Sequence, residues 1–236
     1  MPFEFCLSNI KNQYFILTIF YFLVSSLEIL GDFIGSIELV YITKPILMPL
    51  LIALYLPIWK KQKDLLSKLL ISALFFAFIG DVALMFLSIN EQFFLLGLGA
   101  FMVTQLLYII IFSKTGFQIK KLLKLKSLFV LILFIVVYVA LMYVLYDKLH
   151  NMLIPVLVYG AVVCLMGFLA TMRIVNHLSY LLVLIGACFF ICSDALIAIN
   201  KFIFSADLIF IQPMIMILYV VAQYFIVVGL IKSYNQ

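Results

Sequence analysis

Charged residues are scarce in this chain. It has 236 residues, of which 15 are Lys or Arg and 10 are Asp or Glu, so that only 11% are charged. Hydrophobic residues make up 68% of the chain, and its mean hydropathy is +1.32. Soluble domains carry about 25% charged residues. The composition therefore excludes an ordinary soluble globular protein and indicates one that lies in lipid.

Cysteine and the short catalytic motifs are also lacking. The chain has four cysteines, without a Cys-x-x-Cys pair or a Cys/His grouping, so we expect no disulfide, no metal site and no cofactor. It contains no Gly-x-Ser-x-Gly, His-Glu-x-x-His or Gly-x-x-x-x-Gly-Lys segment. These absences argue against a serine hydrolase, a zinc peptidase and a nucleotide-binding enzyme.

Long apolar runs dominate what is present. A transmembrane helix needs about 20 mostly apolar residues, and the polar interruptions divide this chain into eight such runs. We therefore predict an all-α, polytopic membrane bundle in which residues 1–236 form a single integral membrane domain. The predicted spans are 13–30, 38–57, 66–88, 92–112, 127–146, 151–171, 178–200 and 208–231.

The basic residues predict the orientation, because cytoplasmic loops near helix ends carry an excess of Lys and Arg. One side would hold Lys11, the Trp59 to Lys63 run with Lys68, the run from Lys114 to Lys126, Arg173 and Lys232. The other side would hold only Lys148 and Lys201, with Asp32, Glu38, Glu91, Asp147 and Asp207. Both termini are then cytoplasmic. Basic loops beside lipid headgroups explain the net charge of +5, so we expect no nucleic acid partner.

Two segments around buried aspartates resemble each other. Residues 76–84 read FAFIGDVAL and residues 189–197 read FFICSDALI. In the run that follows each of them, a small residue again precedes glutamine, at Thr104-Gln105 and Ala222-Gln223. Because four spans separate the partners, the pattern indicates two parallel four-helix repeats, residues 1–113 and 127–236.

Three charged side chains interrupt the apolar runs, namely Lys44, Asp81 and Asp194. Charge inside a membrane is costly and marks a functional site by default. From the helical rise, all three lie about 8 to 10 Å inside the non-cytoplasmic boundary. Two carboxyls and one ammonium in one layer would titrate together, with one Asp protonated and the other ionised beside Lys44. The alternative is a Lys–Asp pair that only holds helices together.

Other polar residues predict a cavity around this layer. Gln105 and Gln223 lie deeper, with Tyr108 and Tyr219 on their own helical faces. Glu28 and Asp32 are one turn apart at the outer end of the first span, where a headgroup-facing surface explains them as well as a site entrance does. The candidate substrate-binding residues are Tyr41, Gln105, Tyr108, Tyr159, Ser193, Tyr219 and Gln223.

At Lys44-Pro45, Gly80-Asp81 and Ser193-Asp194, in that order and spacing, the chain resembles the YhhN family of multi-pass membrane proteins, the lysoplasmalogenases. The resemblance runs over most of the chain and includes Tyr108 and Ala222-Gln223. One departure is Gln105, at a position where the family often has a histidine.

The resemblance implies hydrolysis of the vinyl ether bond of lysoplasmalogens, which gives a fatty aldehyde and glycerophosphoethanolamine or glycerophosphocholine. By analogy with glycosidases that use two carboxylates, Asp81 and Asp194 would be the acid and the water-activating base, in either order. Lys44 would hold one carboxylate ionised or bind the substrate phosphate. The partners would be the lysophospholipid substrate and membrane lipid.

Two other readings use the same residues. A proton- or ion-coupled transporter, or a lipid-binding protein, would use the buried charges across the two repeats. A structural membrane protein would need Lys44 only for stability. The compact chain suggests the cytoplasmic membrane of a bacterium.

Overall fold

The computed structural model describes residues 2–87, 89–117, 125–204 and 210–234, with side chains from residue 12 onward. The described parts are helical and contain no strand. Their helices are α1 (Pro2–Ile34), α2 (Ile37–Gln62), α3 (Leu65–Met85), α4 (Gln92–Lys114), α6 (Leu125–Leu149), the 3-10 turn η1 (His150–Met152), α7 (Leu153–Met172), α8 (His177–Phe202) and α9 (Ile211–Ser233).

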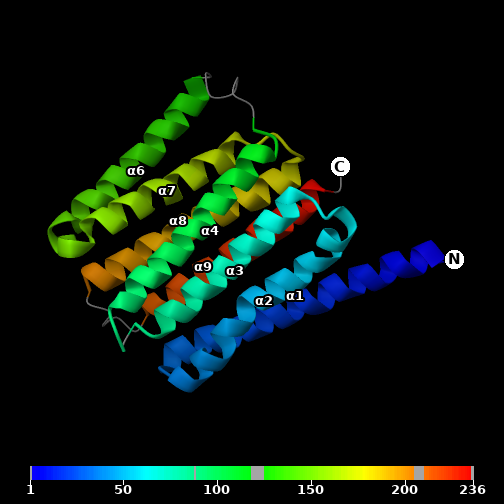
Figure 1. The fold of residues 1–236 in the computed structure, drawn as a ribbon, viewed down its shortest axis with the longest axis horizontal. Helices are drawn as coiled ribbons and strands as arrows, with labels where there is room; N and C mark the ends of the chain where they lie inside the picture. Colours follow the sequence, from blue (N-terminus) through cyan, green and yellow to red (C-terminus); the bar gives the residue numbers. More distant parts are fainter. Residues whose placement is uncertain (1, 88, 118–124, 205–209, 235–236) are drawn as a thin grey trace.

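Seven helical segments within the described residues are long and apolar enough to cross a membrane, so the protein is an integral multi-pass membrane protein. One of these segments, Leu125–Met172, has 48 residues and contains α6, η1 and α7. Because α6 and α7 fold back and pack against each other (Figure 1), each would cross separately. Eight crossings and the cytoplasmic termini stay predictions.

The observed helices extend beyond the predicted spans at most ends. The first predicted span, 13–30, lies within α1, and the fifth, 127–146, lies within α6. The predicted start of the last span, residues 208 and 209, lies outside the described residues, as do Asp207 and the middle of the basic run from Lys114 to Lys126. Basic residues do occupy the last turns of α2, α4 and α9.

Helices adjacent in sequence pack as antiparallel neighbours, and the most extensive contacts join α8 with α9 and α3 with α4. In Figure 1, α6 lies at one edge of the bundle and α1 with α2 at the opposite edge. The close fit of α8 on α9 requires a glycine, since a Cβ at Gly186 would lie 2.8 Å from the carbonyl oxygen of Ala222. The arrangement places α3, α4, α8 and α9 in the middle. The two-repeat prediction is not tested by these contacts.

The helix ends on the predicted cytoplasmic side are held by short polar contacts. Asp64 caps α3 by accepting from the amide of Ser67 at 2.9 Å, and it accepts from the hydroxyl of Tyr234 at 2.8 Å. Burial alone would raise the pKa of Asp64, but these hydrogen bonds lower it below its usual range. Arg173, between α7 and α8, donates to Thr115 at 3.0 Å, and burial lowers its pKa to about 10. These contacts connect α3 with α9, and α4 with the α7–α8 turn.

Candidate functional site

Asp81 lies on α3, where a glycine lets a neighbouring helix approach closely. A Cβ at Gly80 would lie 2.8 Å from a ring carbon of Phe101 on α4. The Asp81 side chain is 3% exposed, and its Oδ2 accepts a hydrogen bond from the hydroxyl of Tyr219 on α9 at 2.9 Å. A carboxyl in such a place is costly unless it is hydrogen-bonded or protonated. The tyrosine supplies that hydrogen bond.

Asp194 has a tyrosine partner of its own. It lies on α8, and its Oδ2 accepts a hydrogen bond from the hydroxyl of Tyr159 on α7 at 2.7 Å. The preceding residue, Ser193, is fully buried and donates to the carbonyl oxygen of Ile215 at 3.1 Å. Ser193 thus contributes to the packing of α8 on α9. Each aspartate therefore belongs to a Tyr–Asp pair that joins two helices.

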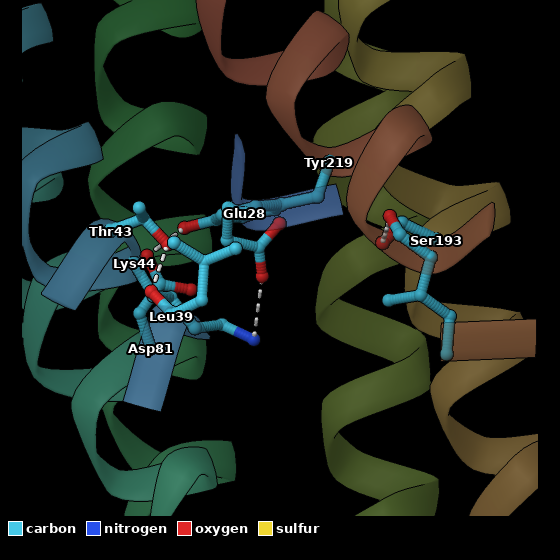
Figure 2. Close-up of polar contacts among 8 residues, drawn as sticks. Glu28, Leu39, Thr43, Lys44, Asp81, Ser193 and Tyr219 are labelled. Carbon is cyan, nitrogen blue, oxygen red and sulfur yellow. Dashed lines mark hydrogen bonds and ion pairs between the residues drawn. The ribbon is translucent and has the colours of Figure 1, made fainter. Parts of the chain in front are cut away.

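Lys44 forms its ion pair with Glu28, a residue that the sequence did not single out as part of the site. Its Nζ lies 3.6 Å from Oε1 of Glu28 on α1 (Figure 2). Glu28 is 0% exposed and Lys44 6%, so Glu28 does not belong to a headgroup-facing surface. The sequence placed an ionised aspartate beside Lys44, and the structure gives it Glu28 as its ion-pair partner. Asp81 is close enough to interact electrostatically with the ammonium.

Lys44 and both aspartates line one cavity of about 120 Å³, as the sequence predicted that they would. This central cavity is also lined by Ser193, Asn200 and Tyr219. The rings of Phe101, Phe190 and Tyr219 pack edge to face, with centroids 5.6 to 6.5 Å apart. Phe101 and Tyr219 line the cavity and Phe190 does not. We call these three rings the aromatic floor.

Two more cavities adjoin the central one. The vestibule, of about 780 Å³, is lined by Asp32, Tyr41, Glu91, Lys201 and Gln212, and shares Lys44 with the central cavity. The apolar chamber, of about 40 Å³, lies between α4, α7 and α8 and shares Asp194, Phe94 and Phe101 with it. Of the predicted binding residues, Tyr41 lies in the vestibule and Tyr159 in the chamber.

The deeper predicted residues form a hydrogen-bonded chain below the floor. Tyr108 donates to Gln223 at 2.6 Å, Gln223 donates to the hydroxyl of Tyr219 at 3.3 Å, and Tyr219 donates to Asp81. Tyr108, Gln223 and Gln105 are fully buried, and none of the three lines the cavities described above. Gln105 lies near Tyr159, yet neither of its amide atoms has a hydrogen-bond partner among the described residues.

The part of the chain that holds most of these residues matches a known family. Residues 39–230 match the model of the YhhN family, which is most of the chain. The chain belongs to the YhhN family. Comparison with curated proteins and with solved structures found no match. In this YhhN protein, α1 up to Ile34 precedes the matched residues, so Glu28 lies outside them.

Two residues of the site were missed by sequence reasoning. For Glu28, a headgroup-facing surface and a site entrance were equally good explanations, although one turn of helix separates it from Asp32 and the two together mark a polar face. Asn200, 8% exposed, lines the central cavity, and its Oδ1 has no hydrogen-bond partner among the described residues. In the sequence, Asn200 is a single polar residue near the end of an apolar run, and nothing there indicated a functional site. The described residues contain no group of three or more His, Cys, Asp or Glu placed to hold a metal ion.

Proposed function

We propose that this YhhN protein is a membrane hydrolase that cleaves the vinyl ether bond of lysoplasmalogens. The observation that carries the proposal is that Asp81 and Asp194 line one small cavity, each held by a tyrosine hydroxyl. Family membership is consistent with this activity. The substrate and the surrounding lipid would be its partners, and the cytoplasmic membrane of a bacterium its location.

The reaction needs an acid and a base. A protonated carboxyl gives its proton to the β-carbon of the vinyl ether, which leaves an oxocarbenium ion at the α-carbon. Water adds there while the second carboxylate takes its proton. The hemiacetal then collapses: its glycerol oxygen takes the proton held by the second carboxyl and its hydroxyl proton goes to the first, which restores both carboxyls and gives the alcohol and a fatty aldehyde. The sum is one vinyl ether and one water converted to one alcohol and one aldehyde.

The surroundings of the two aspartates favour different roles. Asp81 accepts a hydrogen bond from Tyr219, the last in the series that runs from Tyr108 through Gln223 to Tyr219. It also lies near the Lys44 ammonium. Both features stabilise an ionised carboxylate, which suits the base. Asp194 receives one hydrogen bond and borders the apolar chamber. Since the β-carbon belongs to the hydrocarbon part of the substrate, we assign Asp194 as the acid.

Lys44 would stabilise the negative charges of its ion-pair partner Glu28 and of Asp81. In this assignment Glu28, 3.6 Å away, and Asp81, in the lining of the same cavity, supply negative charge to one ammonium. Asp194 can then stay protonated without leaving the ammonium unpaired.

The test is to incubate the purified protein with lysoplasmenylethanolamine and with its saturated 1-alkyl ether analogue. We expect fatty aldehyde and glycerophosphoethanolamine from the first and no product from the second, because a saturated ether has no β-carbon that can accept the proton. Equal release of product from both compounds, or no product from either, would contradict the proposed function.

One observation favours a second candidate, a proton-coupled transporter. The chain from Asp81 through Tyr219 and Gln223 to Tyr108 extends the polar path below the aromatic floor. Transport would make Tyr108 essential, whereas hydrolysis would leave Tyr108→Phe within about fivefold of wild type, since removing one neutral hydrogen bond costs about 1 kcal/mol. Proton movement in sealed vesicles, driven by lysolipid and lost in Tyr108→Phe, would favour transport.

A further inference from the structure

The three cavities adjoin one another in series, which we call the passage, and the polarity of their lining changes from end to end. The vestibule and the central cavity share Lys44, Lys201 and Gln212. The central cavity and the apolar chamber share Phe94, Phe101 and Asp194. A molecule that fills the passage therefore meets the charged side chains of the vestibule at one end, Asp81 and Asp194 in the central cavity, and the apolar side chains of the chamber at the other end.

Resting on the proposed function, we propose that this passage binds a lysolipid in one fixed orientation and selects it by its free glycerol hydroxyl. The first carbons of the hydrocarbon chain would enter the apolar chamber, and the ether bond would lie at Asp194. Asn200 would hold the hydroxyl, and Lys201 with Gln212 would hold the phosphate. This order follows the covalent order of a lysophospholipid.

Asn200 carries the selectivity. Its side chain is more than nine-tenths buried, it lines the central cavity, and its Oδ1 has no hydrogen-bond partner among the described residues. A buried amide oxygen without a partner is costly, and a ligand hydroxyl would remove that cost. A lipid with a second acyl chain has an ester at this carbon, which cannot donate a hydrogen bond and adds bulk.

Lys201 follows Asn200 directly and marks where the central cavity meets the vestibule. Its Nζ lies 3.3 Å from Oε1 of Glu91, which is largely exposed, and 5.8 Å from the centre of the Phe94 ring. Glu91 holds the ammonium at the junction without burying it. Asp32 and Glu91 also line the vestibule, so an amine beyond the phosphate would meet negative charge.

The chamber, of about 40 Å³, suits the first carbons of a hydrocarbon chain. Most of its lining is apolar, including Leu98, Val156, Ile197 and Phe202, and its polar members are Tyr159 and Asp194. It lies between helices that are long and apolar enough to cross the membrane, so acyl chains surround the protein at this depth. Ala198 is the smallest side chain in its wall.

The test measures binding of ligands that cannot be cleaved, so that it is independent of hydrolysis. The ligands are a 1-O-alkyl lysophosphoethanolamine, its 2-deoxy analogue and the corresponding 1-O-alkyl glycerol. For the wild type we expect loss of the hydroxyl to weaken binding about tenfold, the cost of an unpaired buried polar group. Asn200→Leu should bind the hydroxyl and deoxy ligands equally.

Lys201→Gln should weaken binding of the phosphate-containing ligand about tenfold and leave the alkyl glycerol unchanged. Ala198→Leu, which fills the chamber, should weaken the binding of every alkyl ligand. Lys148→Gln, at an exposed lysine in the last turn of α6, is the control and should match the wild type. A wild type that does not distinguish the deoxy ligand, or an Asn200→Leu variant that still does, would overturn the proposal, whatever the outcome of the hydrolysis assay.

Discussion

Replacing either aspartate with asparagine should reduce aldehyde release by at least about 100-fold, the lower end of what general acid–base catalysis contributes. Asparagine keeps the shape of the side chain and still accepts the tyrosine hydrogen bond seen at Asp81 and Asp194, but it neither gives nor takes the proton. The measurement is the initial rate of aldehyde release by Asp81→Asn and Asp194→Asn in detergent micelles.

The pH dependence should separate the two roles. Protons from solvent can replace a missing acid, so the residual rate of Asp194→Asn should rise as the pH falls. The residual rate of Asp81→Asn should not, because that variant lacks the base. Asp147→Asn is the matched control, since Asp147 is exposed near the end of α6. A full rate in either site variant would remove that residue from the mechanism.

Breaking the Glu28–Lys44 pair should cause the largest loss of stability. Removing one partner of a buried ion pair leaves the other charge uncompensated and costs about 3 kcal/mol or more. A charge at the centre of a membrane helix carries a cost of similar size. We therefore expect Lys44→Met, which leaves Glu28 and Asp81 without their counter-charge, to lower the free energy of unfolding by about 3 kcal/mol, measured by titration with SDS. Glu28→Gln should lower it less, because Asp81 still interacts with the ammonium.

The double variant Glu28→Gln/Lys44→Met distinguishes an ion pair from two independent residues. If the 3.6 Å contact is an ion pair, the double variant should lose much less stability than the sum of the single variants. Activity should fall in all three, because Lys44 also lines the central cavity. Additive losses of stability would mean that the two residues are not coupled, and full activity of Lys44→Met would limit Lys44 to a structural role.

The helices were predictable because a membrane imposes a length on apolar runs. Hydropathy reports the hydrocarbon layer and not the end of the helix, which explains why α1 and α6 extend beyond the predicted spans of 13–30 and 127–146. Boundaries are therefore the part of such predictions that structure corrects most often. The side-by-side packing of α6 and α7 follows from the short η1 turn between them.

The sequence predicted how deep in the membrane the site residues lie, but not which neighbours their side chains face. Helical rise placed Lys44, Asp81 and Asp194 in one layer, and all three line the central cavity. The same reasoning cannot tell which neighbour a side chain faces, so the partner of Lys44 was assigned to an aspartate and not to Glu28. Nor does it locate the aromatic floor, beneath which Tyr108 and Gln223 bond to each other.

The central claim is that a carboxyl of this site protonates the β-carbon of a vinyl ether. The most direct measurement is mass spectrometry of the fatty aldehyde formed in D₂O, with the free aldehyde incubated alone as a control for exchange. The account predicts one deuterium on the carbon next to the carbonyl group, beyond the control. Aldehyde without deuterium at that carbon would contradict it.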